Sequence, residues 1–155
     1  MTKWPENLEV LAIIDTQIFV PALALQDPAS AFYSCAFRKC WKFVFSEEII
    51  VEYSSVMHKL GFPATAVYIE QSRLTVWNKM RLSQASGDSL PQGLAPRKDR
   101  HIVAPCHAGD ANVIVTNDSG ILEKAELIHQ QTGGIVLSLD GAQRMLATLP
   151  DCPNR

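Results

Sequence analysis

Short apolar runs alternate along the chain with longer segments in which apolar residues recur at helical spacing. The run at residues 8–14 is interrupted only by Glu9, as is typical of a strand buried on both faces. Further strands are predicted at 42–46, 111–118 and 135–139, and helices at 15–28, 29–41, 46–61, 63–82, 99–109, 120–131 and 141–149. This alternation favours an α/β fold with a parallel sheet and helices on both of its faces.

Residues that start or stop helices sharpen these boundaries. Ser46 is a predicted N-cap, and Gly61 ends the helix that Ser46 begins. Asp140 is predicted to cap the last helix, and Pro105 to kink or shorten the helix that starts near residue 99. Residues 83–97 are rich in Ser, Gly and Pro and show no periodicity, which predicts a long surface or active-site loop.

Length and composition indicate one packed domain. The chain has 155 residues, of which 47% are hydrophobic and 19% charged, so we expect a single domain over 1–150 and a short tail at 151–155. The formal net charge of −2 excludes an overall basic field for nucleic acid. Local basic clusters would have to serve instead: Arg38-Lys39 with Lys42, Lys79 with Arg81, and Arg97-Lys98 with Arg100.

The four cysteines are scattered and show no metal-finger spacing. We expect free thiols in a reducing cytoplasm, with Cys35 and Cys106 in the core and Cys152 exposed in the tail. No signal peptide is recognised at the start, and the longest apolar run is too short to span a membrane. The predicted location is therefore cytoplasmic.

Acidic residues follow two of the predicted strands. Asp15 comes after the first strand and Asp118 after the strand at 111–118, and parallel strands end at one edge of a sheet. Glu52 on the third helix and Asp99 at the start of a helix can join them. Converging carboxylates repel one another strongly, and a divalent cation offsets that repulsion. Oxygen ligands without Cys or His select Mg²⁺ or Mn²⁺.

Taken singly, each acid has a simpler interpretation. Asp15 and Asp99 fit helix N-caps, Glu52 fits a surface glutamate, and Asp118 fits a turn residue. The prediction of a metal site therefore depends on the four acids together.

Three segments that carry these acids resemble the PIN-domain ribonucleases. They are "IIDTQIFVPAL" (13–23), "FVFSEEIIVEYSSVMHKLG" (43–61) and "KDRHIVAPCHAGDANVIVTNDSGIL" (98–122). The last is the most specific, and its "DRH" start is similar to the subgroup related to VapC-type toxins of bacterial toxin–antitoxin pairs. The resemblance covers about residues 8–140. It implies a three-layer α/β/α fold with a central, mainly parallel sheet.

The resemblance also implies a function. It assigns metal binding and catalysis to Asp15, Glu52, Asp99 and Asp118, with supporting or substrate-binding roles for Thr16, Arg100, Thr116 and Asn117. Thr116 would orient the last carboxylate or a metal-bound water. The implied activity is RNA cleavage by a water that Mg²⁺ or Mn²⁺ activates, in a toxin silenced by an antitoxin protein. Dimerisation is a further hypothesis, and no membrane partner is expected.

Departures from the family pattern keep an alternative open. Gln17 replaces the usual Asn, Asn112 replaces an Asp before the last motif's strand, and Pro105 interrupts a helix. A PIN-fold module that binds RNA or protein with little or no cleavage is therefore the second hypothesis. An aspartyl-phosphate phosphatase is disfavoured, since that chemistry wants a second acid where Gln17 stands. His101 is interpreted as a surface or capping histidine, and Arg100 is open between a solvated residue and a phosphate contact.

Overall fold

A parallel sheet forms the centre of the molecule. A computed structural model describes residues 9–23, 26–61 and 80–152. Within them, five parallel strands lie in the order β3-β2-β1-β4-β5. The strands are β1 (Leu11–Ile14), β2 (Lys42–Ser46), β3 (Met80–Ser83), β4 (Val113–Val115) and β5 (Ile135–Leu137). The predicted α/β class and parallel sheet are confirmed.

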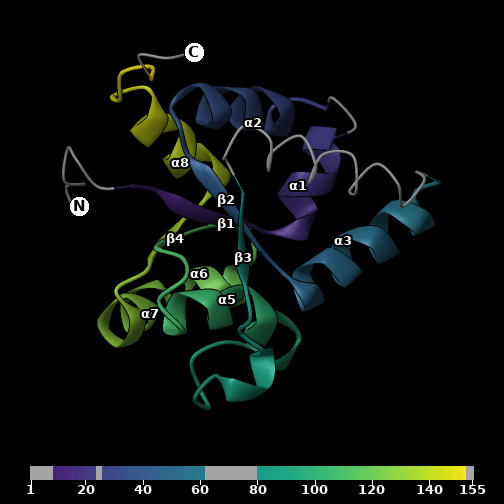
Figure 1. Cartoon of the computed structure of the whole chain (residues 1–155), viewed down its shortest axis with the longest axis vertical. Coiled ribbons are helices and arrows are strands. Elements are labelled where there is room, and N and C mark those ends of the chain that lie inside the picture. Colours follow the sequence, from purple (N-terminus) through teal and green to yellow (C-terminus); the bar gives the residue numbers. More distant parts are fainter. Residues whose placement is uncertain (1–8, 24–25, 62–79, 153–155) are drawn as a thin grey trace.

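Helices cover both faces of this sheet, which makes the three predicted layers (Figure 1). Helices α1, α2, α3 and α8 lie on one face, where α2 packs against α1 and α8, and helices α5, α6 and α7 lie on the other. This division follows from right-handed crossovers in a sheet whose strand order reverses direction after β3. The helices are α1 (Thr16–Leu23), α2 (Ala29–Arg38), α3 (Glu47–Lys59), α5 (Arg100–His107), α6 (Ser119–Leu122), α7 (Ala125–Thr132) and α8 (Leu139–Leu146), with short 3₁₀ helices η1 (Gly87–Ser89) and η2 (Arg97–Asp99).

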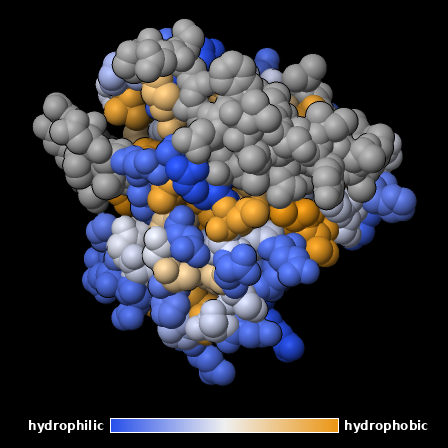
Figure 2. Space-filling model, viewed as in Figure 1, coloured by the Kyte–Doolittle hydropathy of each residue, from blue (hydrophilic) through white to orange (hydrophobic). Residues whose placement is uncertain are grey.

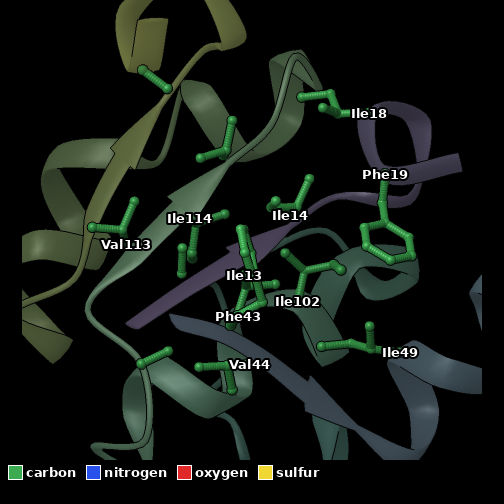
Figure 3. Close-up of a cluster of buried hydrophobic side chains, with 14 of the residues drawn as sticks. Ile13, Ile14, Ile18, Phe19, Phe43, Val44, Ile49, Ile102, Val113 and Ile114 are labelled. Atoms are coloured by element: carbon green, nitrogen blue, oxygen red, sulfur yellow. The ribbon is translucent and has the colours of Figure 1, made fainter. Parts of the chain in front are cut away.

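The core lies on both sides of the central strands (Figure 3). Ile13 on β1 and Ile114 on β4 are fully buried, and Ile102 of α5 packs into the same cluster. On the α1 side, the rings of Phe19 and Tyr53 stack with centroids 4.3 Å apart. Burial on both faces explains why β1 and β4 read as continuous apolar runs in the sequence.

Three predicted boundaries are wrong. Residues 80–82 were expected to end a helix and residue 83 to begin a loop, but 80–83 form β3, which pairs with β2; residues 63–79 of that predicted helix lie outside the described part of the chain. The predicted helix at 120–131 is two helices, α6 and α7. The N-cap of α8 is Ser138 and not Asp140, because the Ser138 hydroxyl accepts a hydrogen bond from the Gly141 amide at 3.0 Å.

Pro105 affects the helix that contains it less than the sequence predicts. Helix α5 continues through Pro105 and ends two residues later at His107. The Pro105 carbonyl then accepts hydrogen bonds from the amides of Asp110, at 2.9 Å, and Ala111, at 3.2 Å. A proline removes one hydrogen bond from a helix, and α5 ends within one turn of Pro105.

The expectation of four free thiols is wrong for two of them. Cys40 and Cys152 form a disulfide across 112 residues of sequence, while Cys35 and Cys106 are free. The fold brings the tail to the end of α2, where the Cys152 amide donates to the Arg38 carbonyl at 3.1 Å and Lys39 pairs with Asp151 at 3.0 Å. Sequence spacing could not reveal this neighbourhood. Among the described residues, no helix is long and apolar enough to cross a membrane.

Candidate active site

The candidate site lies where the strand order of the sheet reverses. Strands β1 and β4 are neighbours, but the chain leaves them toward opposite edges of the sheet. Asp15 directly follows β1, and its amide donates to the carbonyl of Val115, the last residue of β4, at 2.9 Å. Ligands of open α/β sheets bind in the crevice at such a switch point.

Thr116 ties two of the four acids together. This fully buried threonine donates from its hydroxyl to Asp15 Oδ2 at 2.6 Å and accepts from the Asp118 amide at 3.0 Å. The hydroxyl therefore orients the carboxylate of Asp15 and holds the backbone of Asp118, while a contact with the Asp118 carboxylate or a metal-bound water stays a prediction. The position of Asp15 relative to the turn that carries Asp118 is thus set by one side chain.

The two carboxylate oxygens of Asp118 have different partners. Its Oδ1 accepts from the amides of Gly120, at 2.8 Å, and Ile121, at 3.3 Å, and so caps α6. Its Oδ2 lies 3.5 Å from the ammonium group of the exposed Lys98. The turn-residue interpretation and the site interpretation of Asp118 are therefore compatible, because they use different oxygens.

Asp99 is brought to this place by a close contact between two loops. A Cβ atom on Gly120 would lie only 2.7 Å from Pro96 Cγ, so glycine lets η2 approach α6. Asp99 ends η2 with 8% of its surface exposed, and it makes no side-chain cap on α5. Its Oδ2 is buried and finds no hydrogen-bond partner among the described residues. Asp99 thus occupies the N-cap position of α5, as the simpler interpretation predicts, but its side chain does not cap the helix.

Burial and like charges shift the pKa values of the two most enclosed acids. Burial, with the charges of Asp118 and Asp15 adding to it, raises the pKa of Asp99 to about 6. Burial also raises the pKa of Asp15, although the Thr116 hydroxyl opposes the shift. The charge of Glu52 raises the pKa of Asp15 further. These acids therefore interact in the folded protein, as groups that share one site do.

Glu52 reaches the same cavity from α3 and is held by two side chains. The Thr16 hydroxyl donates to its Oε1, and His101 Nε2 lies 2.9 Å from its Oε2. Burial alone would raise the pKa of Glu52, but these two contacts outweigh it and the pKa is lowered. Burial would lower the pKa of His101, whereas Glu52 raises it more, so the pKa of His101 is raised. The surface interpretation of His101 is wrong, because its side chain is 12% exposed and faces Glu52.

The four acids line one open cavity of about 750 Å³, which we call the acidic cavity. Thr16, Gln17 and His101 also line it, and Lys59 and Lys98 lie at its wall. The sequence did not single out Lys59, because it belongs to no motif; only its helical position seven residues after Glu52 points to it.

Two residues predicted to support the site lie elsewhere. Asn117 Oδ1 accepts from the Leu139 amide at 3.0 Å and thus holds the start of α8. Arg100 Nε donates to the Gly87 carbonyl at 3.1 Å, and its Nη2 donates to the Leu90 carbonyl, so the guanidinium braces the loop after β3. Asn112, the departure before β4, bridges to β1 through the Leu11 amide at 2.8 Å.

The donors suit a hard divalent cation in kind. They are carboxylate oxygens with hydroxyl neighbours, and the buried, unpartnered Oδ2 of Asp99 is an oxygen that a cation would satisfy. In the described part of the chain, however, no three His, Cys, Asp or Glu side chains are arranged to hold a metal ion as they stand. Glu52 in particular is turned to Thr16 and His101. Binding a metal would require these side chains to move.

Comparison with known proteins identifies the family. The family model described as the PIN domain matches residues 12–120, a span that includes all four acids. Searches of curated proteins and of solved structures give no match. Because the match covers more than half of the chain, the protein belongs to the PIN domain family.

Proposed function

We propose that the protein is a metal-dependent endoribonuclease that hydrolyses RNA phosphodiester bonds in the acidic cavity. PIN domains are generally nucleases, which supports hydrolysis as the class of reaction. The observation that carries the proposal is the carboxylate of Asp99, which is buried near Asp15 and Asp118 with a pKa raised to about 6 and with one oxygen that has no partner among the described residues. Burying an unpaired acid costs stability, and a structural role does not require that cost.

Each acid has a separate part in this proposal. Asp15, Asp99 and Asp118 would provide the oxygen ligands for Mg²⁺ or Mn²⁺, and Glu52 would join them after leaving Thr16 and His101. A bound divalent cation supplies charge stabilisation for the phosphodiester and lowers the pKa of water. Thr116 keeps Asp15 oriented, and Lys98, exposed at the cavity wall 3.5 Å from Asp118 Oδ2, would contact a substrate phosphate.

Cleavage of a labelled single-stranded RNA tests the proposal. The wild type is compared in Mn²⁺, in Mg²⁺ and in EDTA with Asp118→Asn, a variant whose amide oxygen can still cap α6. We expect the wild type to cleave the RNA only when Mn²⁺ or Mg²⁺ is present, and the cleavage rate of the variant to be at least 100-fold lower. Metal-independent cleavage, or equal cleavage by the variant, would contradict the proposal. RNA binding without cleavage would instead support the alternative of a PIN-fold binding module.

The resemblance to VapC-type toxins extends the proposal to a toxin that an antitoxin protein silences, in a cytoplasmic setting. Its support is the "DRH" start at Asp99, Arg100 and His101. Induced expression in a bacterium should arrest growth with the wild type and not with Asp118→Asn. Light scattering at micromolar concentration tests the associated hypothesis of a homodimer, which a single monomer mass would refute.

A further inference from the structure

A second cavity opens beside the acidic cavity, under the loop that joins β3 to α5. It measures about 550 Å³, within the range of small-molecule sites, and we call it the loop cavity. Glu48 and His101 line both cavities, so the two are adjacent. The loop and its 3₁₀ helices form the teal and green lower part of Figure 1, and the lower part of the same face is largely hydrophilic in Figure 2.

The floor of the loop cavity is built from fixed groups. The Gly87 amide donates to Glu48 Oε1 at 2.8 Å, and the Gly87 carbonyl accepts from Arg100 Nε at 3.1 Å. A Cβ atom on Gly87 would lie 3.1 Å from the His101 amide nitrogen, so the loop packs tightly on α5. Leu90 and Leu94, both buried, anchor the loop to the core. The cavity is therefore formed before any ligand arrives.

The two cavities differ in charge. Six carboxyl groups line the acidic cavity against the two cations Lys59 and Lys98, so it repels an anion until a metal is bound. The loop cavity holds two acids, Glu48 and Asp88, against two arginines, Arg97 and Arg100. A phosphate of an RNA strand is thus more readily held in the loop cavity than in the acidic one.

Arg97 is the cation available for this purpose. Glu48 and Arg100 are engaged with the loop backbone, and Lys98 lies beside Asp118. Arg97 is exposed, lines the cavity and has no hydrogen bond or ion pair to another described residue. Gln92 lines the cavity as well and carries an amide that both donates and accepts.

We propose that the loop cavity binds the nucleotide next to the scissile phosphate of a single-stranded RNA, with Arg97 holding its phosphate and Gln92 contacting its base edge. The inference rests on the proposed function and deepens it. An unpaired strand is required, because the base edges of an RNA helix are accessible only from its shallow groove. Phosphate contacts set position and affinity, whereas base contacts set sequence preference, so the two residues should differ in effect.

Steady-state cleavage of single-stranded RNA in Mn²⁺ tests the inference with Arg97→Ala and the matched control Arg144→Ala. Arg144 has the same charge, is 77% exposed and pairs with Asp140 on α8, away from both cavities. We expect Arg97→Ala to raise KM by about tenfold with kcat within about twofold. Losing one phosphate contact should also lower the slope of log affinity against log salt by about 0.7. The control should change neither quantity.

Gln92→Ala gives an independent readout. Its total cleavage summed over substrates should change little, but its preference among substrates that differ at the neighbouring base should change by about fivefold or more. The inference is overturned if Arg97→Ala behaves like Arg144→Ala, if it lowers kcat without raising KM, or if Gln92→Ala keeps the wild-type preference. A wild type that neither cleaves nor binds RNA overturns the proposed function itself, and is thereby distinguished from failure of this inference alone.

Discussion

Replacing Asp99 with asparagine should make the metal-free protein more stable. The residue is 8% exposed, its carboxyl Oδ2 has no partner among the described residues, and burial with the charges of Asp118 and Asp15 raises its pKa to about 6. Ionisation of Asp99 therefore disfavours the folded state. Asparagine has nearly the same shape, carries no charge and can donate to the neighbouring carboxylates.

The size of the gain follows from the pKa difference between folded and unfolded states. The folded value of about 6 and the ordinary value of 3.8 differ by about two units, each equivalent to about 1.4 kcal/mol. Solvent screening in the open cavity reduces the sum to about 1–2 kcal/mol. For a chain of 155 residues this raises Tm by about 2–8 °C.

The sign of the pH dependence is also determined. Because the folded pKa lies above the unfolded one, the wild type loses stability as pH rises from about 4 to about 6, and the loss is complete above that range. The two proteins should melt alike near pH 3.5 and diverge as pH increases. Asp88→Asn, a change of the same kind at an exposed residue, is the control.

Thermal melting in EDTA and in Mn²⁺ is the assay. In EDTA near pH 7, Asp99→Asn should melt above the wild type, while in Mn²⁺ the wild type should gain more than the variant. A variant that is less stable than the wild type in EDTA at every pH would refute the reasoning, since Asp99 would then be a structural residue.

Three further changes have expected outcomes. Arg100→Ala should lower the free energy of unfolding by about 1.5–3 kcal/mol in denaturant titration, because it removes both guanidinium bonds to the loop backbone. Thr116→Val should move the acidic limb of the cleavage–pH profile to higher pH. The Thr116 hydroxyl lowers the pKa of Asp15 in the wild type, so its removal raises that pKa, and an unmoved limb would contradict this. Without a reductant, Cys152→Ser should lower the free energy of unfolding by about 2–4 kcal/mol relative to the wild type. This difference should vanish when both proteins are measured in a reductant.

Much of the fold was predictable because the central strands are buried on both faces. The apolar run at 42–46 coincides with β2, and the Ser46 hydroxyl accepts from the Ile49 amide at 3.2 Å as an N-cap should. Strand β3 was missed because it pairs along one side only, as an edge strand, and Leu82 is 59% exposed. Its pairing with β2 is a tertiary interaction that local sequence does not encode. A domain over 1–150 stays a prediction.

The site was predictable only as far as the sheet determines it. Parallel strands bring Asp15 and Asp118 to one edge, and this follows from alternation alone. The partners of each acid could not be predicted in this way, because they depend on the segments between the strands. Asp99 lies on η2, and α5 brings His101 to Glu52. The sequence places Thr116 directly after a strand, but it does not say which carboxylate the buried hydroxyl contacts.

Mn²⁺ binding tests most directly the claim that these carboxylates form a divalent metal site. Electron paramagnetic resonance of free Mn²⁺ at pH 7 measures the bound fraction in the wild type, Asp99→Asn, Asp118→Asn and the control Asp88→Asn. The account predicts saturable binding by the wild type and the control, with at least tenfold weaker binding by Asp99→Asn and Asp118→Asn. Equal binding by all four proteins, or none by the wild type, would contradict it.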